Sequence, residues 1–282
     1  MLHQEGSTTG ALLLTPDGPV DLMQVTAVWY RRFAPGHALP ADTPMRPAAV
    51  QESRATLAGL IEVLPAFHLD AVADVRRAGV KPLQLRLAAE LGLPVPRTLV
   101  TNDPEAVRHF ASECPGGVVA KTLSSFVVHD EEGRELAVYT SWVREEHLED
   151  LDGLQLSPMQ FQEWVPKAFE LRCTVVGNRV FSAALDVGLL DRGKVDWRIE
   201  GSELAAAWRP HELPPEVEQA LLSLLDKLGL NYAAIDLILT PDGRYVFLEV
   251  NPCGEFRWLN DLEELSIAEA IAGVLTGEAR RT

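Results

Sequence analysis

Three side chains with oxygen atoms interrupt two apolar segments near the C-terminus, and their spacing favours a metal site. Asp236 lies in the first segment, residues 235–239, and Glu249 and Asn251 lie in the second, residues 245–251. If a two-residue loop at Asp242-Gly243 joins the segments, Asp236 faces Glu249 and Asn251 shares their side of the hairpin. Two opposed carboxylates in a half-buried sheet are destabilising unless a proton or cation lies between them. Oxygen ligands of these types suit Mg²⁺ or Mn²⁺.

The same acidic residues also fit a plain structural interpretation. An Asp within a strand is more often found at a sheet edge or facing solvent, and a longer turn would shift the pairing of Asp236. The hairpin alone therefore leaves the metal site and the structural interpretation open.

Two lysines further upstream are candidates for binding phosphate. Lys81 comes directly before a predicted helix, and Lys121 ends the apolar segment 118–120. A lysine that ends a buried strand can point inward as a compact positive charge. For either lysine alone, a surface position with a buried apolar stem is the simpler interpretation.

The segment 161–166 and the following carboxylate have the groups that a nucleoside requires. An apolar strand that runs through Gln162 and Glu163 into a proline loop offers backbone groups to a purine edge, and Glu170 could accept both ribose hydroxyls. Trp164, Val165 and Phe169 also fit as ordinary core side chains.

Composition excludes several classes of protein. The 282-residue chain has 25 Lys and Arg against 41 Asp and Glu, a formal charge of −16, which argues against a nucleic-acid partner. Hydrophobic residues make up 47% of the chain, as in globular proteins, but no segment approaches the ~20 apolar residues of a membrane span. No basic region precedes the first apolar run, so we expect no signal peptide. Cys114, Cys173 and Cys253 fit neither a disulfide framework nor a zinc site, which favours a reducing, cytoplasmic location.

The pattern of apolar residues and turn signals predicts an α+β protein with hairpins and separate helices. Gly79 to Pro82 is the expected boundary between an N-terminal unit, residues 1–78, and the remainder, residues 79–282. Helices are predicted at 47–64, 82–91, from Asp103-Pro104, at 215–228 and at 266–275, the last with a capping box of Ser266 and Glu269. Strands are predicted within 10–32 and at 118–121, 126–128, 136–143, 159–165, 171–176 and 180–185.

In this order, these residues resemble the ATP-grasp ligase superfamily over about residues 79–282. The elements that carry the resemblance are Lys81 with Gly-Leu-Pro-Val-Pro after its helix, Val-Ala-Lys121, Gln162-Glu163-Trp164-Val165, Glu170-Leu-Arg172, and Asp236 with Glu249-Val-Asn251. The resemblance implies two α+β subdomains that clasp ATP, with a small lid-type subdomain at about 97–165 and a metal-binding subdomain at about 166–282. A short pre-ATP-grasp unit would precede them.

Within that superfamily the chain looks most like the maturases of microviridin-type ribosomal peptides, the graspetides. This narrower resemblance is carried by Trp29-Tyr30-Arg31-Arg32, residues 98–101, Asp196-Trp197-Arg198 and residues 251–256. It implies that the enzyme activates side-chain carboxylates of a precursor peptide as acyl phosphates and forms esters with Ser/Thr or amides with Lys. It also implies a precursor leader that docks near residues 185–198, and a homodimer.

The resemblance also implies roles for individual residues. Lys81 and Lys121 would hold ATP phosphates, Gln162 and Glu163 to Val165 would line adenine, and Glu170 would bind ribose. Asp236, Glu249 and Asn251 would hold Mg²⁺, with Mn²⁺ as an alternative ion. Arg198 and Arg172 would contact the phosphate that is transferred.

Two departures from the family pattern keep other functions open. The chain starts close to Trp29, so we expect an incomplete or shortened N-terminal unit, and Lys121 is followed by Thr-Leu-Ser-Ser instead of a glycine-rich lid. The alternatives are a ligase that adds glutamate or another amino acid to a protein or peptide, and a nucleotide-binding partner without turnover. If the ATP-grasp interpretation is right, Lys81, Lys121, Arg172 and Arg198 should be gathered at one cleft despite the acidic composition.

Overall fold

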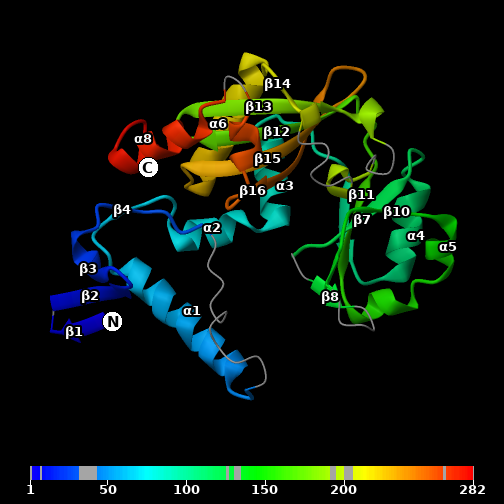
Figure 1. Cartoon of the computed structure of the whole chain (residues 1–282). Coiled ribbons are helices and arrows are strands. Elements are labelled where there is room, and N and C mark those ends of the chain that lie inside the picture. The colour runs from blue at the N-terminus through cyan, green and yellow to red at the C-terminus, as the bar shows by residue number, and fades with distance from the viewer. Residues whose placement is uncertain are drawn as a thin grey trace.

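Figure 1 shows the computed structural model of the whole chain, in which residues 2–6, 8–31, 43–124, 127–129, 135–190, 195–199, 206–262 and 265–281 are described. Its helices lie beside separate, mostly antiparallel sheets, which confirms the predicted α+β class. None of the helices in these ranges has the length and apolar character needed to cross a membrane.

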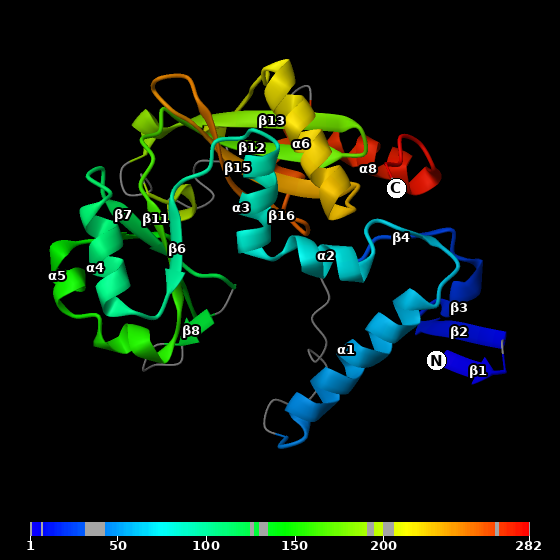
Figure 2. The same cartoon turned by 180° about the vertical axis from the view of Figure 1, so that it is seen from behind.

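The N-terminal unit consists of a small sheet and one long helix. Strands β1 (Leu2–Glu5), β2 (Thr8–Thr15) and β3 (Gly18–Asp21) form an antiparallel sheet in that order. The 3-10 helix η1 (Leu22–Gln24) comes next, and β4 (Ala27–Val28) then pairs in parallel with β5 (Phe67–His68). Helix α1 (Arg46–Glu62) connects β4 to β5 and extends away from the rest of the molecule, with Ile61 as its buried residue (Figures 1 and 2).

Two short helices lead from this unit to the two larger sheets of the molecule. Helix α2 (Val72–Ala78) ends at Gly79, and α3 (Lys81–Glu90) begins two residues later with Pro82 in its first turn. Gly92 has a φ of +82°, a conformation that glycine adopts at low cost where a helix stops. The predicted helix at 82–91 is therefore confirmed.

A four-stranded antiparallel sheet follows, in the order β10-β7-β11-β6. Its strands are β6 (Thr98–Thr101), β7 (Val118–Lys121), β10 (Ser141–Val143) and β11 (Met159–Glu163). Helices α4 (Pro104–Ser112) and α5 (Glu145–Glu149) and the 3-10 helix η2 (Asp152–Leu156) accompany it. Phe110 and Phe161 belong to its small apolar core. All of these elements lie within residues 97–165, the segment predicted as a lid-type subdomain, a boundary that stays a prediction.

The predicted single strand at 136–143 is wrong. Strand β9 (Glu135–Ala137) pairs with β8 (Val127–His129), whereas β10 pairs with β7 in the larger sheet. The chain changes sheets at Thr140, whose amide donates a hydrogen bond to Asp196 and not to a neighbouring strand.

The largest sheet has five antiparallel strands in the order β14-β13-β12-β15-β16. They are β12 (Phe169–Val176), β13 (Arg179–Asp186), β14 (Arg209–Pro210), β15 (Tyr232–Leu239) and β16 (Tyr245–Asn251). The 3-10 helix η3 (Val187–Leu189) follows β13. Helix α6 (Pro215–Leu228) covers one face together with α3, and its leucines pack on Leu171, Cys173 and Ile235 (Figure 2).

The opposite face of this sheet carries the polar residues, because side chains alternate along a strand. Glu170 and Arg172 on β12 and Asp236 on β15 all belong to this face. Further along the same face, Tyr232 packs in a second apolar cluster with α7 (Arg257–Asn260) and α8 (Ile267–Thr276). Core packing on one face therefore supports the positions of charged groups on the other.

The start of α8 differs from prediction. Ser266 is the residue before the helix, but its side chain makes no capping hydrogen bond. Instead the Asn260 side-chain oxygen accepts from the amide of Ala268 at 2.8 Å. A residue of the preceding helix α7 therefore satisfies an amide that the local pattern attributed to Ser266.

Candidate functional site

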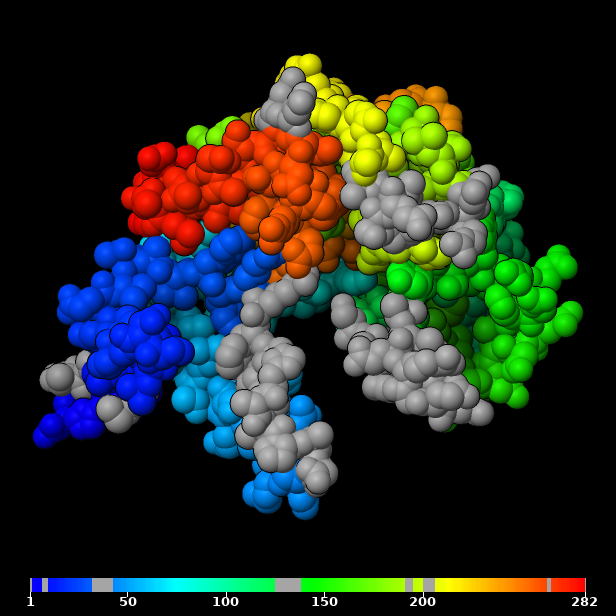
Figure 3. All heavy atoms as spheres, viewed as in Figure 1, coloured from blue at the N-terminus to red at the C-terminus, as the bar shows by residue number. Residues whose placement is uncertain are grey.

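The structure gathers most of the predicted site residues around one cavity of about 550 Å³. The cavity lies between the four-stranded and five-stranded sheets, close to the hollow in the surface that Figure 3 shows beside the N-terminal unit. Its lining includes Lys81, Lys121, Glu170, Arg198, Asp236, Glu249 and Asn251. Arg172 lies directly behind Asp236, so the four predicted cations are gathered, as the ATP-grasp interpretation requires.

Asp236 faces Glu249 across β15 and β16, as predicted. The loop between the strands is not the predicted two-residue turn, however, because Leu239 pairs with Tyr245 and residues 240–244 form the loop. A β-bulge between Asp236 and Leu237 leaves Leu248 as the extra residue on β16. The bulge shifts the pairing by one position and so restores the predicted pair.

The amide of Asn251 lies between the two carboxylates. Its nitrogen is 3.4 Å from an Asp236 oxygen and 3.2 Å from a Glu249 oxygen. The amide turned over would present its oxygen to a cation in the same place, because the two ends have nearly equal shape. The three residues therefore fit a hard divalent ion that keeps some water or phosphate ligands. Among the described residues there is no group of three or more His, Cys, Asp or Glu that could hold a metal without such additional ligands.

The two carboxylates have different electrostatic surroundings. Burial raises the pKa of Asp236, although its neighbour Arg172 opposes this shift. Burial also acts on Glu249, but Lys81, the Asn251 amide, Lys121 and Arg198 together hold the pKa of Glu249 below its usual value. Nearby cations thus keep at least one of the opposed acids ionised at neutral pH.

Lys81 links the start of α3 to the carboxylates. Its ammonium group is 3.1 Å from Glu249 and donates to the carbonyl of Thr122 at 2.9 Å. One turn further on, the buried Gln84 side chain donates to the carbonyls of Ala78 and Val250 and accepts from the Val250 amide at 2.9 Å. Gln84 therefore fixes α3, and with it Lys81, against the strand that carries Glu249.

Lys121 ends β7 and lines the cavity from the side of the four-stranded sheet. Burial lowers the pKa of Lys121 to about 8, and the charge of Glu249 opposes that shift. A lysine that loses charge this easily gains from any anion that approaches it, so it suits a phosphate group.

Glu170, the predicted ribose ligand, forms a buried ion pair with Lys167. Lys167 also donates to the carbonyl of Val195 at 3.0 Å, so its ammonium group joins two segments of the cavity wall. Burial raises the pKa of Glu170, and the Lys167 charge opposes this effect. One Glu170 oxygen is thereby occupied, and the other can accept from a ligand hydroxyl.

The segment from Gln162 to Val165 lines a narrower cavity that adjoins the first. The amides of Glu163 and Trp164 donate to the carbonyls of Arg97 and Gly117. These two amides are therefore used within the protein, and the Val165 amide is the one we consider for a purine. Gln162 donates to the Thr98 hydroxyl at 3.0 Å, which holds β11 beside β6.

This narrower cavity has a volume of about 30 Å³, which is close to the volume of one water molecule in the liquid. One wall comes from Val119 and Trp164, and the other from Ile238 and Leu248.

Arg198 is held by Asp196, a residue two positions earlier. Its Nε and Nη2 atoms donate to the two Asp196 oxygens at 2.7 and 2.6 Å. Asp196 is 4% exposed and also accepts from the Thr140 amide at 3.1 Å. The Asp196 hydrogen bond raises the pKa of Arg198 further, so the guanidinium stays charged beside the cavity. Asp196 thereby connects Arg198 to the chain just before β10.

Arg172, predicted as a second contact to the transferred phosphate, is buried behind Asp236. Its Nη1 donates to Asp236 at 2.7 Å and its Nη2 donates to the carbonyl of Glu255 at 3.2 Å. Both contacts are with the protein, and the side chain is only 9% exposed. This placement favours a role in holding Asp236.

The sequence analysis did not assign a role to three residues of the site, Gln84, Asp196 and Lys167. Gln84 had a usable signal, since it lies on the same helical face as Leu87, Ala88 and Leu91 and is polar there. Asp196 is part of the Asp-Trp-Arg segment that marked the resemblance. Lys167 follows a proline in a loop, where a lysine usually faces solvent, and only its tertiary contacts identify it.

The chain matches known proteins at three levels. A family model described as the MvdD pre-ATP grasp domain matches residues 1–76. Macrocyclase MdnC from Microcystis aeruginosa, solved with its precursor peptide MdnA, is 42% identical with a TM-score of 0.87; the match covers 98% of this chain and 86% of that one. A RiPP-associated ATP-grasp ligase from Chryseobacterium gregarium, solved with ADP and leader and core peptides, is 38% identical with a TM-score of 0.92, and the match covers 98% and 84% of the two chains.

A more distant relative is a probable alpha-L-glutamate ligase from Psychromonas ingrahamii. It is 24% identical over 260 residues, which span 89% of this chain and 81% of the relative.

Proposed function

The chain belongs to the RiPP-associated ATP-grasp ligases, ADP-forming enzymes, and we propose that it crosslinks side chains within a ribosomal precursor peptide. The observation that carries the proposal is the cavity in which Lys81 and Lys121 face the opposed carboxylates of β15 and β16. Arg198 lines the same cavity, and its side chain is 51% exposed.

We assign the residues of the cavity to ATP as follows. Lys121 and Lys81 hold the phosphates, and Glu170 accepts from the ribose hydroxyls while Lys167 holds it in place. The segment Gln162 to Val165 lines adenine, in part through the Val165 amide. Asp236, Glu249 and Asn251 would hold Mg²⁺, which would offset the negative charge that develops on the phosphates, with Mn²⁺ as an alternative ion.

The proposed reaction has two steps. A side-chain carboxylate of the peptide attacks the γ-phosphorus of ATP; the bond from that phosphorus to the β–γ bridging oxygen breaks, and ADP leaves with its electron pair. A hydroxyl or amine of the same peptide then attacks the acyl carbon, the carbon–oxygen bond to phosphate breaks, and the nucleophile loses its proton. Each crosslink therefore removes the elements of one water from the peptide.

The chain contributes positioning and electrostatics to these steps. Lys121 and Arg198 both line the cavity and offset the negative charge of the phosphoryl group during transfer. Asp196 holds the Arg198 guanidinium in one orientation, so its cost of ordering falls on folding and not on the reaction. None of these roles requires a protein nucleophile.

We propose a peptide substrate because both of the most similar structures described above contain one. The leader is proposed to dock near residues 185–198, of which 191–194 lie outside the described residues. Leu189 is 59% exposed there and offers an apolar contact to an amphipathic leader. The net charge of −16 favours a leader with basic residues.

A homodimer and a cytoplasmic location remain parts of the proposal. Leu13 on β2 pairs with Val20 on β3, and Leu2 shares their side of the small sheet; all three are more than 40% exposed. A second copy covering this side would bury it, and the molar mass from light scattering tests that. No disulfide joins the cysteines within the described residues, which fits a reducing compartment.

The alternative function is addition of glutamate or another amino acid to a protein or peptide, which the similarity to a probable glutamate ligase supports. A further alternative, a nucleotide-binding partner without turnover, predicts binding of nucleotide with no release of ADP. Crosslinking lowers the mass of the peptide, addition of an amino acid raises the mass of the acceptor, and a partner without turnover changes neither.

Incubation of the enzyme with MgATP and a precursor peptide encoded beside its gene distinguishes them by mass spectrometry. The proposal predicts loss of one water mass per crosslink together with ADP release. A gain of one residue mass supports the amino-acid-adding ligase, and an unchanged peptide without ADP supports the non-catalytic partner. Fragmentation of the product then shows whether Ser/Thr esters or Lys amides formed.

A further inference from the structure

The Trp29-Tyr30-Arg31-Arg32 segment has no part in the function described so far, although it marks the resemblance to peptide maturases. Arg32 lies outside the described residues, but Arg31 reaches a loop 223 positions further along the chain. Its Nη2 atom donates to the carbonyl of Gly254 at 3.1 Å and to the Glu255 carboxylate at 2.6 Å. Arg31 therefore joins the N-terminal unit to the loop that follows β16.

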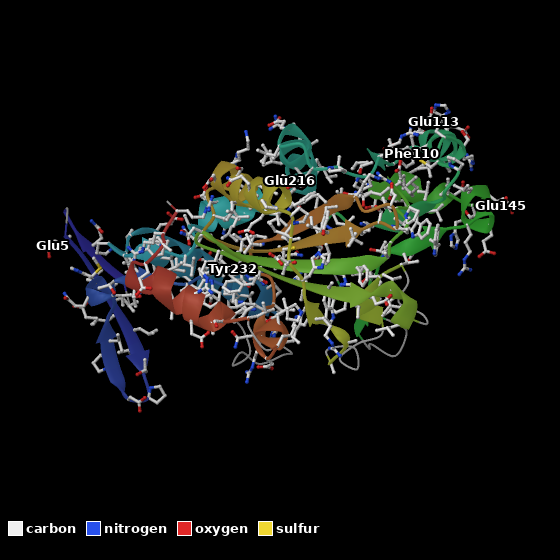
Figure 4. All side chains as sticks on the ribbon, turned by 90° about the horizontal axis from the view of Figure 1, so that it is seen from above. Glu5, Phe110, Glu113, Glu145, Glu216 and Tyr232 are labelled. Atoms are coloured by element: carbon white, nitrogen blue, oxygen red, sulfur yellow. The ribbon has the colours of Figure 1, made fainter. Side chains whose placement is uncertain are left out.

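Aromatic rings hold the Arg31 guanidinium from two sides. Its central carbon lies 5.4 Å from the Trp29 ring centre and 5.2 Å from that of Phe256. Trp29 in turn packs at 5.5 Å against Tyr232, which Figure 4 labels near the end of the five-stranded sheet. With only 25% of the Arg31 side chain exposed, this is a packed contact and not a loose surface pair.

The loop that Arg31 holds also holds Arg172. The carbonyl of Glu255 accepts from Arg172 Nη2 at 3.2 Å, and the carbonyl of Gly254 accepts from the Tyr232 hydroxyl at 2.6 Å. A side chain at Gly254 would place its Cβ 2.3 Å from the Ala234 Cβ and 2.9 Å from Arg172 Nη2. The loop and Arg172 are thus in tight contact, and a shift of one moves the other.

Arg172 contacts Asp236, one of the three proposed cation ligands. Its other terminal nitrogen, Nη1, donates to Asp236 Oδ1 at 2.7 Å, which leaves Asp236 Oδ2 on the side of Asn251. A continuous set of contacts therefore runs from Arg31 through the 254–255 loop and Arg172 to Asp236. Partners of this kind orient a ligand and commonly change metal affinity when they are removed.

We propose that Arg31 is a positioning residue for the divalent-cation site. It holds the loop so that Arg172 keeps one Asp236 oxygen occupied and the other directed at the cation. This inference rests on the proposed function of Asp236, Glu249 and Asn251 as the cation ligands. The N-terminal unit then has a part in metal binding that its distance along the chain conceals.

The test is the affinity for Mn²⁺ in the presence of saturating ADP, measured on the full chain from the electron paramagnetic resonance signal of free Mn²⁺. Arg31→Ala is expected to weaken Mn²⁺ binding about 5- to 10-fold, somewhat less than the loss of a direct outer partner. Arg31→Lys, which keeps the charge but loses the planar fork, should lie between it and the wild type. In turnover, excess Mg²⁺ should restore the rate of Arg31→Ala with KM for ATP unchanged.

Arg280→Ala is the matched control. Arg280 also stacks on an aromatic ring of the N-terminal unit, 3.7 Å from the centre of Phe67, and donates to the carbonyls of Val274 and Leu275. It makes no described contact with the 254–255 loop. Its loss should reduce stability and leave the Mn²⁺ affinity within about twofold, as expected for a distant, independent site.

Glu255→Gln keeps the test decisive if Arg31→Ala does not fold. The Glu255 side chain is 45% exposed, and Arg172 uses the backbone carbonyl of this residue, so the change removes the charge that pairs with Arg31 and keeps the carbonyl that Arg172 needs. We expect a loss of about two- to threefold in Mn²⁺ affinity, with no further loss when both changes are combined. Unchanged Mn²⁺ affinity in folded Arg31→Ala or Glu255→Gln overturns this inference alone. If the wild type with ADP binds no Mn²⁺, the proposed cation site is wrong as well.

Discussion

Asp236 lies directly opposite Glu249 although the loop between their strands is longer than a two-residue turn. The β-bulge at Leu248 compensates for the longer loop, so both carboxylates face the same cavity. Bulges are common beside active sites, where they change the direction of a side chain. Here the bulge determines whether the two acids meet at all.

Loss of either carboxylate should abolish turnover. Asp236→Asn and Glu249→Gln each remove one of the two anionic groups proposed to hold Mg²⁺, and we expect ADP release to fall more than ~100-fold, beyond the effect of losing an outer partner. A coupled assay for ADP measures this. Asp242→Asn, in the exposed pair with Arg244, is the control and should keep wild-type activity. Full activity of either carboxylate variant would contradict the proposed site.

Gln84 should be essential for stability as well as for Lys81. In Gln84→Leu the amide and carbonyl of Val250 and the carbonyl of Ala78 lose their partner inside the core, which should lower the free energy of unfolding by about 3 kcal/mol. Urea denaturation measures the loss. Gln219→Leu, on the exposed side of α6, should change it by less than about 0.5 kcal/mol. Equal effects of the two changes would show that Gln84 does not join α3 to β16.

The binding of ADP should depend on pH through Lys121. Its pKa of about 8 lies below the ordinary value of 10.5, so Lys121 loses its proton at a lower pH in the folded protein than in the unfolded chain. The charged form is the one that attracts phosphate, so ADP affinity without metal should fall by up to ~10-fold per pH unit above pH 8. Calorimetry in buffers of different ionisation enthalpy should show proton uptake on binding at that pH. Lys121→Arg, always charged, should show neither effect, and a flat wild-type profile would contradict the assignment.

The same depressed pKa has a defined effect on folding stability. Between pH 8 and 10 the unfolded chain still carries the Lys121 proton and the folded protein has lost it, so stability rises with pH through this window. The unfavourable contribution of Lys121 is therefore fully present below pH 8. Comparison of unfolding curves for the wild type and Lys121→Met at pH 7 and pH 9.5 should show a smaller difference at the higher pH, and an equal difference at both would contradict the shift.

Asp196 should act through Arg198. Asp196→Asn loses the paired contact to the guanidinium, and we expect kcat to fall about 10- to 100-fold, the effect of a small misplacement of a catalytic group. If the two residues act as one unit, Asp196→Asn should add little to Arg198→Ala in a double-mutant cycle. Additive effects on kcat would show that Asp196 has a separate role.

Local patterns predicted those parts of the fold that local interactions determine. Helix α3, helix α6 and strands β12, β13, β15 and β16 follow from apolar periodicity and turn residues, whereas the two-residue strand β14 was not predicted. The break at Thr140 could not be predicted because it depends on Asp196, 56 positions further along the chain, and the cap of α8 could not because Asn260 belongs to the preceding helix α7. Propensity has no information on such partners.

The site shows the same division. The pair of Asp236 and Glu249 was predicted from a two-residue turn that the structure does not have, and only the bulge restores it. The order of the motifs along the chain identified Lys81 and Lys121. Lys167 could not be identified in this way, since its role depends on Glu170 and on the carbonyl of Val195. The burial of Arg172 was also outside the reach of the sequence, because a loop from residues 254–255 takes up its second nitrogen.

The narrow cavity beside Val165 has a consequence for the order of events in peptide maturation. Its walls belong to two different sheets, so we expect these sheets to separate when ATP enters the proposed site and when ADP leaves it. The proposed reaction uses one ATP per crosslink, so a precursor with several crosslinks must either stay bound through several openings or rebind after each one. The ratio of partly to fully crosslinked products at early times then measures whether the enzyme works processively or releases its peptide after every bond.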